Sequence, residues 1–409
     1  MDWTLAGIVR THAGARANKP MITYGARVIS YAEMHERSSR VAHGLLAEGV
    51  GPQDHVAFLD RNGPEYFEVL FGGGKVNAIN VAVNWRLAPA EMEYTINDAE
   101  ARVLFVGQEF LPHLDRIEGS LRTVRKIVVI GDHPRHERYE AWVARHRVED
   151  PGLSSAADDV AMQLYTSGTT GLPKGAMLTN RNLGSLLPYA SPMWRFDATS
   201  VNAVAMPLFH IGGSGWALVG MWNGCHSILF REFVPKEVLA ALEQHRITNA
   251  LFVPAMLQLL SAVPGAADGD YRSLRSIVYG ASPITNDVLL RSMRTFRCDF
   301  IQVYGLTETT GAITQLGPAD HDPDGLRARL LRSAGKPHPW VEIRVVDPET
   351  GEDRPTGAVG ELWTRSVQNM KGTGADRRRR RASSPGMAGS GPATPGSSTR
   401  RGTSSSPSA

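Results

Sequence analysis

Residues 165–175 read Tyr165-Thr-Ser-Gly-Thr-Thr-Gly-Leu-Pro-Lys-Gly175, a segment rich in glycine and hydroxyl groups with a lysine near its end. Gly168 and Gly171 allow a tight turn and a close approach of the backbone to a ligand. Backbone N–H groups in such a bend form a concave anion site, and Lys174 adds a point charge suited to a polyphosphate. The hydroxyl groups of the bend belong to Thr166, Ser167, Thr169 and Thr170. The segment therefore predicts a phosphate-binding loop.

The chain on either side of this loop indicates how the loop is held. The apolar run Met162–Tyr165 precedes it and is typical of a buried strand, and a helix is expected from about Asn180. A loop between a strand and a helix is a common phosphate site. It is not a Walker A motif, because Pro173 precedes the lysine and Gly175 follows it. A flexible surface loop of the same composition is the alternative.

The rest of the sequence extends this pattern in both directions. Short apolar runs alternate with segments of helical spacing, which predicts an α/β fold with a parallel sheet. After Pro337 apolar and polar residues alternate, which predicts a small antiparallel β unit at about 337–366. Ser30 and Glu33 are candidates for a helix cap. The expected strands are 56–59, 103–106, 127–130, 249–253, 276–279 and 299–304, and the expected helices are 31–46, 63–72 and 283–294.

The composition of the 409 residues is that of a globular protein, with 42% hydrophobic and 21% charged residues. The two cysteines, Cys225 and Cys298, form no CxxC pair, which argues against a disulfide scaffold or a cysteine-based zinc site. No basic segment followed by a hydrophobic stretch opens the sequence, so a secretory signal is not expected. These features predict a cytoplasmic protein.

One segment is long enough to cross a bilayer without a charge. Residues 198–230 contain no Asp, Glu, Lys or Arg, but they include Pro207, His210 and five glycines. Those residues favour buried helix and strand in a large core or a ligand pocket. Peripheral contact with a membrane is the alternative.

The net charge of +3 hides an uneven distribution. Residues 373–409 hold seven arginines and one acid, so this tail carries +6 and residues 1–372 carry −3. The tail contains no Val, Ile, Leu, Phe, Trp, Tyr or Cys, so it buries too little apolar surface to fold and is expected to be disordered. We therefore expect an ordered body over 1–372 that has no nucleic acid partner, followed by a tail.

The phosphate loop resembles the signature of the AMP-forming acyl-adenylate superfamily, which includes acyl-CoA synthetases, luciferases and the adenylation domains of peptide synthetases. The similarity extends from about Tyr31 to about Lys371. It implies a large adenylate-forming domain with parallel α/β subdomains and a small β unit near its C-terminal end. Four further segments match family motifs in the expected order: Met206-Pro-Leu-Phe-His-Ile-Gly-Gly213, Tyr279-Gly-Ala-Ser-Pro-Ile284, Gln302-Val-Tyr-Gly-Leu-Thr-Glu-Thr309 and Gly357-Ala-Val-Gly-Glu-Leu-Trp363.

The resemblance implies that a carboxylate attacks the α-phosphorus of ATP, that pyrophosphate leaves, and that the acyl group then passes to coenzyme A. It implies that Glu308 binds Mg²⁺, that Thr169 helps to hold the metal or the phosphates, and that Thr307 contacts the α-phosphate. His210 would lie beside the acid and the path of the thiol. With Lys174, the residues Thr307, Glu308 and His210 are the predicted catalytic residues. Nucleotide binding is expected from loop residues 166–171 and from an adenine slot made of Gly280, Ala281, Ser282, Pro283, Tyr304 and Gly305.

The sequence departs from the family pattern after Gly372. The family continues into a Thr-Gly-Asp motif that holds the ribose, then a hinge and a small mobile domain with a catalytic lysine, and none of these is recognisable here. We therefore expect the mobile catalytic domain to be absent and adenylation to be impaired. An out-of-frame translation of the gene would explain the tail, and a basic arm for nucleic acid or anionic lipid is the alternative.

The expected function is that of an acid–CoA ligase that uses ATP and Mg²⁺ to activate a hydrophobic carboxylic acid, because the uncharged stretch 198–230 favours an apolar substrate. A fatty acyl-AMP ligase that serves a carrier protein is one alternative, and a catalytically dead nucleotide-binding remnant is another. The sequence does not determine the identity of the acid, the acceptor thiol or the oligomeric state.

Overall fold

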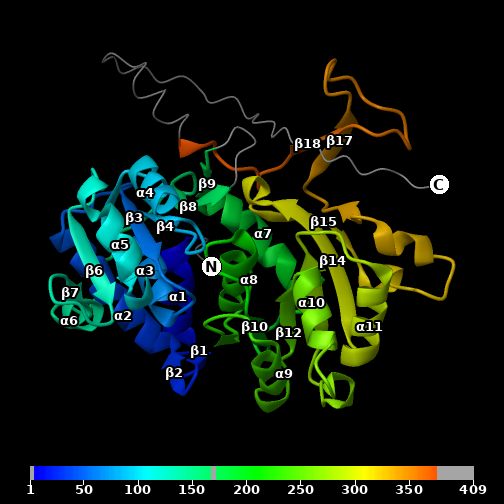
Figure 1. Cartoon of the computed structure of the whole chain (residues 1–409), viewed down its shortest axis with the longest axis horizontal. Helices are drawn as coiled ribbons and strands as arrows, with labels where there is room; N and C mark the ends of the chain where they lie inside the picture. Colours follow the sequence, from blue (N-terminus) through cyan, green and yellow to red (C-terminus); the bar gives the residue numbers. More distant parts are fainter. Residues whose placement is uncertain (1–3, 167–171, 375–409) are drawn as a thin grey trace.

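The computed structural model describes residues 4–166 and 172–374, which form two large β-sheets and a small one (Figure 1). The first large sheet has the strand order β7-β6-β5-β3-β4-β8-β9, and its neighbouring strands are parallel except for β8 and β9. Its strands are β3 (His55–Leu59), β4 (Ile79–Ala82), β5 (Ala101–Gly107), β6 (Lys126–Ile130), β7 (Glu137–Arg138), β8 (Val160–Thr166) and β9 (Lys174–Thr179).

The second large sheet has nine strands in the order β16-β15-β14-β13-β12-β10-β11-β1-β2. The pairs from β14 to β1 are parallel, and the antiparallel pairs lie at the two edges. Its strands are β1 (Pro20–Tyr24), β2 (Arg27–Ser30), β10 (Val201–Val204), β11 (His226–Leu229), β12 (Asn249–Phe252), β13 (Ser276–Gly280), β14 (Asp299–Leu306), β15 (Gly311–Leu316) and β16 (Lys336–Pro337).

The helices form three layers around the two sheets, because alternate side chains of each strand face opposite sides. In β3, Val56 and Phe58 belong to the core between the sheets, whereas Ala57 and Leu59 belong to the core on the outer face. Helices α1 (Leu5–Ala15), α2 (Tyr31–Ala47), α3 (Pro64–Lys75), α7 (Asn180–Met193) and α8 (Ile211–Trp222) share the central core with both sheets. Helices α4 (Pro89–Asp98) and α5 (Leu111–Ile117) cover the outer face of the first sheet, and α9 (Pro235–Gln244), α10 (Pro254–Ser261) and α11 (Asn286–Phe296) cover that of the second.

Shorter elements complete the described chain. Helix α6 (Tyr139–Ala144) packs against α2, and Ser30 caps α2 by accepting a hydrogen bond from the backbone N–H of Glu33 at 3.1 Å, as predicted. The 3₁₀ helices are η1 (Gln108–Phe110), η2 (Glu118–Ser120), η3 (Ala266–Asp268), η4 (Thr307–Thr309), η5 (Pro318–Asp320) and η6 (Ala328–Arg332).

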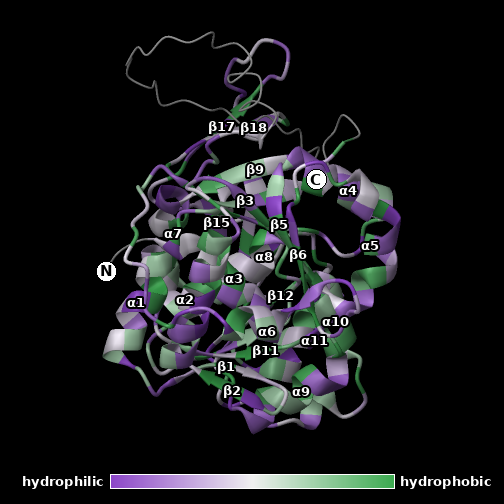
Figure 2. Ribbon diagram, turned by 90° about the vertical axis from the view of Figure 1, so that its left-hand side faces the viewer, coloured by the Kyte–Doolittle hydropathy of each residue, from purple (hydrophilic) through white to green (hydrophobic). Residues whose placement is uncertain are grey.

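The predicted small β unit is present as β17 (Glu342–Val346) and β18 (Glu361–Arg365), which pair in antiparallel fashion. Figure 2 shows this unit at the end of the molecule where β9 lies. The chain after β18 returns to the first sheet, where the N–H of Lys371 donates to the carbonyl of Met177 at 2.9 Å. The N–H of Met177 donates in turn to the carbonyl of Gly372 at 3.0 Å.

The α/β class and the parallel centre of each sheet confirm the predicted fold, but two local predictions are wrong. The segment after β8 does not lead directly into a helix, because residues Lys174–Thr179 pair with β8 as the antiparallel strand β9. Helix α7 begins at Asn180 as expected, since the Thr179 side chain accepts from the N–H of Asn182. Helix α11 begins at Asn286 and not at Pro283, because Thr285 caps it.

The uncharged segment 198–230 folds as β10, α8 and β11 within the body. Within the described ranges, no helix combines the length and the apolar character needed to cross a membrane.

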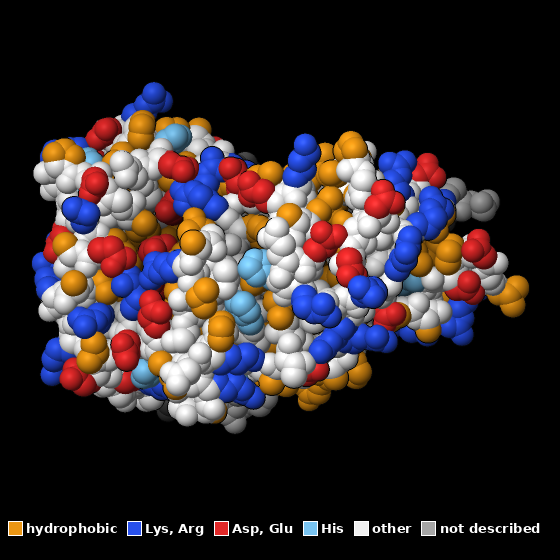
Figure 3. Space-filling view, turned by 90° about the horizontal axis from the view of Figure 1, so that it is seen from below, with side chains coloured by type: hydrophobic (Ala, Val, Ile, Leu, Met, Phe, Trp, Pro, Cys, Tyr) orange, Lys and Arg blue, Asp and Glu red, His pale blue; other side chains and the backbone are white. Residues whose placement is uncertain are grey.

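Acidic and basic side chains lie interspersed over the face shown in Figure 3. The predicted disordered tail lies outside the described residues from residue 375 onward.

Candidate active site

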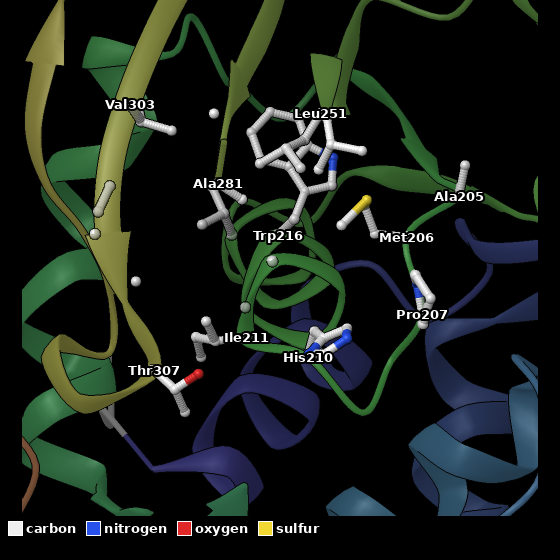
Figure 4. A pocket seen from close by; sticks show the side chains of 18 of the residues that line it. Ala205, Met206, Pro207, His210, Ile211, Trp216, Leu251, Ala281, Val303 and Thr307 are labelled. Atoms are coloured by element: carbon white, nitrogen blue, oxygen red, sulfur yellow. The ribbon is translucent and has the colours of Figure 1, made fainter. Parts of the chain in front are cut away.

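The carboxyl ends of parallel strands from both large sheets meet around one cavity of about 660 Å³ (Figure 4). In open α/β sheets this is the edge at which ligands bind. The first sheet contributes residues that follow β3 and β4 and the last residue of β8, and the second contributes residues at the ends of β10 to β14. These lining residues are Asn62, Trp85, Arg86, Thr166, Ala205, Met206, Pro207, Arg231, Glu232, Phe233, Val253, Gly280, Ala281, Thr307 and Glu308.

Thr166 and Glu308 join the two sheets across this cavity. Thr166 is the last residue of β8, and its hydroxyl donates to Oε1 of Glu308 in η4 at 3.2 Å. Lys174 is the cross-strand partner of Thr166 at the start of β9, and its side chain is exposed. The predicted loop residues Ser167, Gly168, Thr169, Thr170 and Gly171 lie outside the described residues. The residue before that loop, Thr166, therefore lies beside Glu308.

The donors at this point suit a hard cation. Glu308 is 7% exposed, and its carboxylate and the Thr166 hydroxyl supply oxygen ligands of the kind that Mg²⁺ prefers. The described part of the chain contains no group of three or more His, Cys, Asp or Glu side chains that could hold a metal. This donor set fits a magnesium ion that takes one or two ligands from protein and the rest from phosphate and water.

A buried amide behind Glu308 fixes the turn that carries it. Gln368 is fully buried, and its Nε2 donates to the carbonyls of Thr309 at 3.1 Å and Ala312 at 3.0 Å. The hydroxyl of Thr310 donates to the carbonyl of Gln368 at 2.6 Å, and the N–H of Met370 donates to the carbonyl of Glu308 at 2.8 Å. The sequence analysis missed Gln368, because no local pattern distinguishes a glutamine that is buried by a chain segment about 60 residues away.

Three of the six residues of the predicted adenine slot line the cavity. Gly280, Ala281 and Gly305 line the cavity, whereas Ser282, Pro283 and Tyr304 are not among its lining residues. Val303, Gly305 and Leu306 of β14 line the cavity, and the register of β14 against β15 shifts between Tyr304 and Gly305. A Cβ on Gly280 would lie 2.1 Å from the carbonyl oxygen of Val303, so the neighbouring strand by itself requires glycine there.

His210 and Thr307 lie on the same side of the cavity (Figure 4). His210 is the residue before α8, its ring opens into the cavity, and the ring of Phe209 lies 4.3 Å from it between centroids. Desolvation by the surrounding protein, followed by the charge of Arg86, lowers the pKa of His210 below its usual value. A neutral imidazole therefore faces the cavity at pH 7.

On the side away from His210 and Thr307 the cavity is lined by the apolar side chains of Trp216, Leu251 and Val303 (Figure 4). The cavity is also lined by Leu186 of α7, Trp194 after α7, Val219 of α8 and Ala312 of β15. The indoles of Trp194 and Trp216 lie 5.6 Å apart between centroids with 35° between their planes. Met221 is fully buried and does not line the cavity. This part of the cavity is apolar and can hold a hydrophobic group.

Charged and aromatic side chains surround the mouth of the cavity, and the sequence analysis did not single them out. Arg61 lies over the ring of Trp85 at 4.7 Å and pairs with Glu232. Arg86 lies over the same ring at 4.8 Å, and Arg231 pairs with Glu109 at 2.8 Å. These residues follow β3, β4, β5 and β11, and strand ends that are far apart in sequence meet only in the folded sheet.

Comparison with known proteins agrees with this geometry. The model of the AMP-binding enzyme family matches residues 9–373. The fatty acid–[acyl-carrier-protein] ligase ScoC of Streptomyces coeruleorubidus is 36% identical over 374 residues, which are 90% of this chain and 70% of the relative. Feruloyl-CoA synthase of an Amycolatopsis species is 34% identical over 86% of this chain and 67% of its own length. Indoleacetate–CoA ligase of Aromatoleum aromaticum is 32% identical over 88% of this chain and 69% of its own length.

Solved structures show the same fold. The anthranilate CoA ligase AuaEII in complex with anthranoyl-AMP is 26% identical, with a TM-score of 0.84 over 93% of this chain and 72% of that one. ATP-bound MatB from Rhodopseudomonas palustris is 26% identical, with a TM-score of 0.80 over 93% of this chain and 74% of that one. The N-terminal domain of FACL13 from Mycobacterium tuberculosis has the same fold, with a TM-score of 0.84 and 23% identity. The match covers 93% of this chain and 94% of that domain.

The chain therefore belongs to the AMP-binding enzyme family. This confirms the predicted family and the predicted class of enzyme, a ligase of the acyl-CoA synthetase type, for which ATP and coenzyme A are co-substrates.

Proposed function

We propose that this cavity activates a hydrophobic carboxylic acid with ATP, releasing pyrophosphate and forming an acyl-AMP that then acylates the thiol of coenzyme A and releases AMP. The observation that carries the proposal is the contact between Thr166 and Glu308 above an apolar cavity. It brings the end of the phosphate loop and a carboxylate to one point, where phosphoryl charge can be bound next to an acyl group.

The proposed chemistry is mainly positioning and electrostatic stabilisation. A carboxylate oxygen of the acid forms a bond to the α-phosphorus, and the bond from that phosphorus to the pyrophosphate oxygen breaks. Negative charge spreads over the phosphoryl oxygens, so fixed positive charges and N–H or O–H donors accelerate the step. Mg²⁺ bound to Glu308 would supply positive charge there, with Thr169 as a further proposed ligand. Lys174 is proposed to bind the leaving phosphates, and Thr307 to donate to the α-phosphate.

The remaining predicted residues are given roles by their places around the cavity. Gly280, Ala281 and Gly305 are proposed to form the wall against which the adenine lies. The neutral ring of His210 stands beside the mouth and is proposed to contact the carboxylate without repelling the magnesium ion. The apolar end lined by Trp216 and Leu251 is proposed to hold the hydrophobic part of the acid.

An acyl carrier protein is a second candidate for the thiol that accepts the acyl group. ScoC, at 36% identity, is a ligase that acts on an acyl carrier protein, whereas the feruloyl and indoleacetate enzymes form coenzyme A esters. Incubating the protein with acid, ATP and either coenzyme A or a phosphopantetheinylated carrier protein separates these candidates. We expect the coenzyme A ester to form faster, and exclusive acylation of the carrier protein would assign the other acceptor.

The first half-reaction has its own test. Exchange of labelled pyrophosphate into ATP, measured with a panel of aliphatic and aromatic acids, requires only adenylation. We expect slow exchange, because the sequence departs from the family motif after Gly372, and we expect that exchange to depend on both a hydrophobic acid and Mg²⁺. Binding of non-hydrolysable acyl-sulfamoyl-adenosines by calorimetry tests the site independently of turnover. A chain that neither exchanges pyrophosphate nor binds these conjugates would refute the proposed function.

A further inference from the structure

The described end of the β8–β9 hairpin, residues 165–166 and 174–175, extends beyond the rest of the first sheet. The ladder between β4 and β8 stops at Leu164, so Tyr165 and Thr166 pair only with β9 within the ladders that the structure describes. The chain after β18 bridges to the outer edge of β9 at Ala176, two residues further from the loop than the start of β9. The hairpin end is therefore a two-stranded ribbon, and such a ribbon needs further contacts to keep its position.

One face of the hairpin end is fastened to helix α4. The hydroxyl of Tyr165 donates a hydrogen bond to Oδ2 of Asp98, the last residue of α4, at 2.7 Å. Successive side chains of a strand point to opposite faces, and Tyr165 packs against the core on the outer face, whereas Leu164 belongs to the core between the sheets. Tyr165 is not among the residues that line the cavity, and Thr166 is. Tyr165 therefore supports the site from behind.

A buried glutamine continues this connection across the sheet. Gln163 is 1% exposed, and its Nε2 donates to the hydroxyl of Tyr165 at 2.9 Å. Its Oε1 lies 3.2 Å from Nε2 of His55 in β3. An amide oxygen can only accept, so this contact requires a proton on Nε2 of His55. The hydrogen bonds then all run in one direction, from His55 to Asp98, and bonds in such a chain strengthen one another.

Gly175, the last residue of the phosphate-loop motif, gives this chain its room. Gly175 is the cross-strand partner of Tyr165, next to Lys174. A Cβ on Gly175 would lie 2.4 Å from Nε2 of Gln163 and 2.9 Å from its Cγ, so it would displace the amide that supports Tyr165. The residues at the two ends of the motif, Tyr165 and Gly175, therefore belong to one brace.

The position of Asp98 argues against a role in the stability of α4 alone. A carboxylate at the C-terminal end of a helix meets the negative end of the helix dipole, which disfavours it. Asp98 is the last residue of α4, so its charge weakens the helix that carries it. What the carboxylate holds explains it better, because a hydroxyl donates more strongly to a charged acceptor than to a neutral one.

We infer that Tyr165 is a positioning residue for the triphosphate of ATP, because its hydrogen bond to Asp98 holds the hairpin end, and Lys174 with it, at the β- and γ-phosphates. This inference rests on the proposed function, since it takes the leaving phosphates to lie at Lys174. The adenosine and the α-phosphate are proposed to lie against other elements. Loss of the Tyr165 hydroxyl should therefore weaken the binding of a triphosphate and leave that of a monophosphate unchanged.

The test compares α,β-methylene-ATP with Mg²⁺ against AMP, by calorimetry on the full chain. Tyr165→Phe should bind the triphosphate about 3- to 10-fold more weakly than the wild type, which is the range of one net hydrogen bond, and should bind AMP equally well. The matched control is Tyr139→Phe, because the hydroxyl of Tyr139 also donates to a carboxylate at 2.7 Å, that of Glu68 in α3. Tyr139→Phe should keep both affinities.

Asp98 offers a second pair of variants if Tyr165→Phe folds poorly. Asp98→Asn keeps an oxygen that can accept from Tyr165 and should keep the wild-type ratio of the two affinities, whereas Asp98→Ala should weaken only the triphosphate. No loss, or an equal loss of both affinities, in Tyr165→Phe or Asp98→Ala would overturn the inference and leave the proposed function standing. Wild-type protein that binds AMP but not the triphosphate would also overturn it. If the wild type binds neither nucleotide, the proposed function itself fails.

Discussion

The hydroxyl of Thr166 and the carboxylate of Glu308 are 142 residues apart in the sequence and 3.2 Å apart in the structure. One is the last residue of β8 in the first sheet, and the other lies in the 3₁₀ turn after β14 in the second. Their contact is where the proposed phosphate loop meets the proposed magnesium ligand, so the relative placement of the two sheets sets the geometry of the proposed site.

Replacing Glu308 with glutamine should separate catalysis from folding. Glutamine keeps the size of the side chain and an oxygen that can accept from Thr166, but it removes the charge that binds Mg²⁺. We expect pyrophosphate exchange to fall by about 10²- to 10³-fold, as when one positioned electrostatic group is lost, while the melting temperature stays close to that of the wild type. Thr166→Val, which removes only the hydroxyl, should have a smaller effect. Normal exchange by Glu308→Gln would show that this carboxylate does not take part in the reaction.

Gln368 should act as a positioning residue for the turn that carries Glu308. Gln368→Leu leaves the carbonyls of Thr309 and Ala312 without their donor, and each buried unsatisfied group costs about 1–3 kcal/mol. We expect a lower free energy of unfolding in urea and weaker binding of acyl-sulfamoyl-adenosine. Val367→Ala is the matched control, because that side chain is 53% exposed beside the same turn. Full stability and affinity in Gln368→Leu would contradict the assigned role.

Two glycines of α8 should respond in opposite ways to alanine. A Cβ on Gly215 would lie 3.2 Å from Cδ1 of Ile211, a flexible side-chain end, and Gly215 lines the cavity. Gly215→Ala should keep or raise stability, since alanine is favoured over glycine by up to about 1 kcal/mol within a helix, and should shift selectivity toward slimmer acids. A Cβ on Gly213 would lie 2.1 Å from the backbone oxygen of Pro207, so Gly213→Ala should cost about 1–3 kcal/mol. Thermal unfolding measures the stability of the two variants, and activity with a panel of acids measures the selectivity of Gly215→Ala. Similar melting temperatures for the two variants would contradict the predicted difference between Gly213 and Gly215.

His338 should make the protein sensitive to acid. The ring is 2% exposed beside Trp340, and burial lowers the pKa of His338 to about 4. In the unfolded chain a histidine has a pKa of about 6.5, so between these values the unfolded state binds a proton that the folded state does not. Stability is therefore lost as the pH falls from about 6.5 toward 4, by roughly 3 kcal/mol from this group.

His338→Phe should flatten that part of the stability profile, as measured by urea unfolding at a series of pH values. The matched control is His245→Phe, because His245 is exposed, and its replacement should change the slope less than His338→Phe, since the charge of His245 acts only on the pKa of His226 nearby. An unchanged slope in the His338 variant would mean that its ring is protonated in the folded state as readily as in the unfolded chain.

Much of the fold could be predicted because it depends on short-range pattern. The apolar runs that became β3, β5, β6 and β13 and the cap that Ser30 provides for α2 are visible within a few neighbouring residues. Strand β9 could not be predicted in the same way, since its residues 174–179 form a strand only by pairing with β8 across the loop.

The sequence by itself determined the chemical groups available to this protein: a glycine- and hydroxyl-rich loop next to a lysine, an acid in Thr307-Glu-Thr309 and an apolar stretch for a hydrophobic substrate. Only the tertiary structure decided which of these groups meet. It placed Thr166 against Glu308, buried Gln368 behind that turn and gathered Trp216 and Leu251 into the lining of one cavity. The physical reason is that local sequence sets backbone preference and side-chain chemistry. Contacts between residues far apart in the chain are set by how two sheets pack around a shared helical layer.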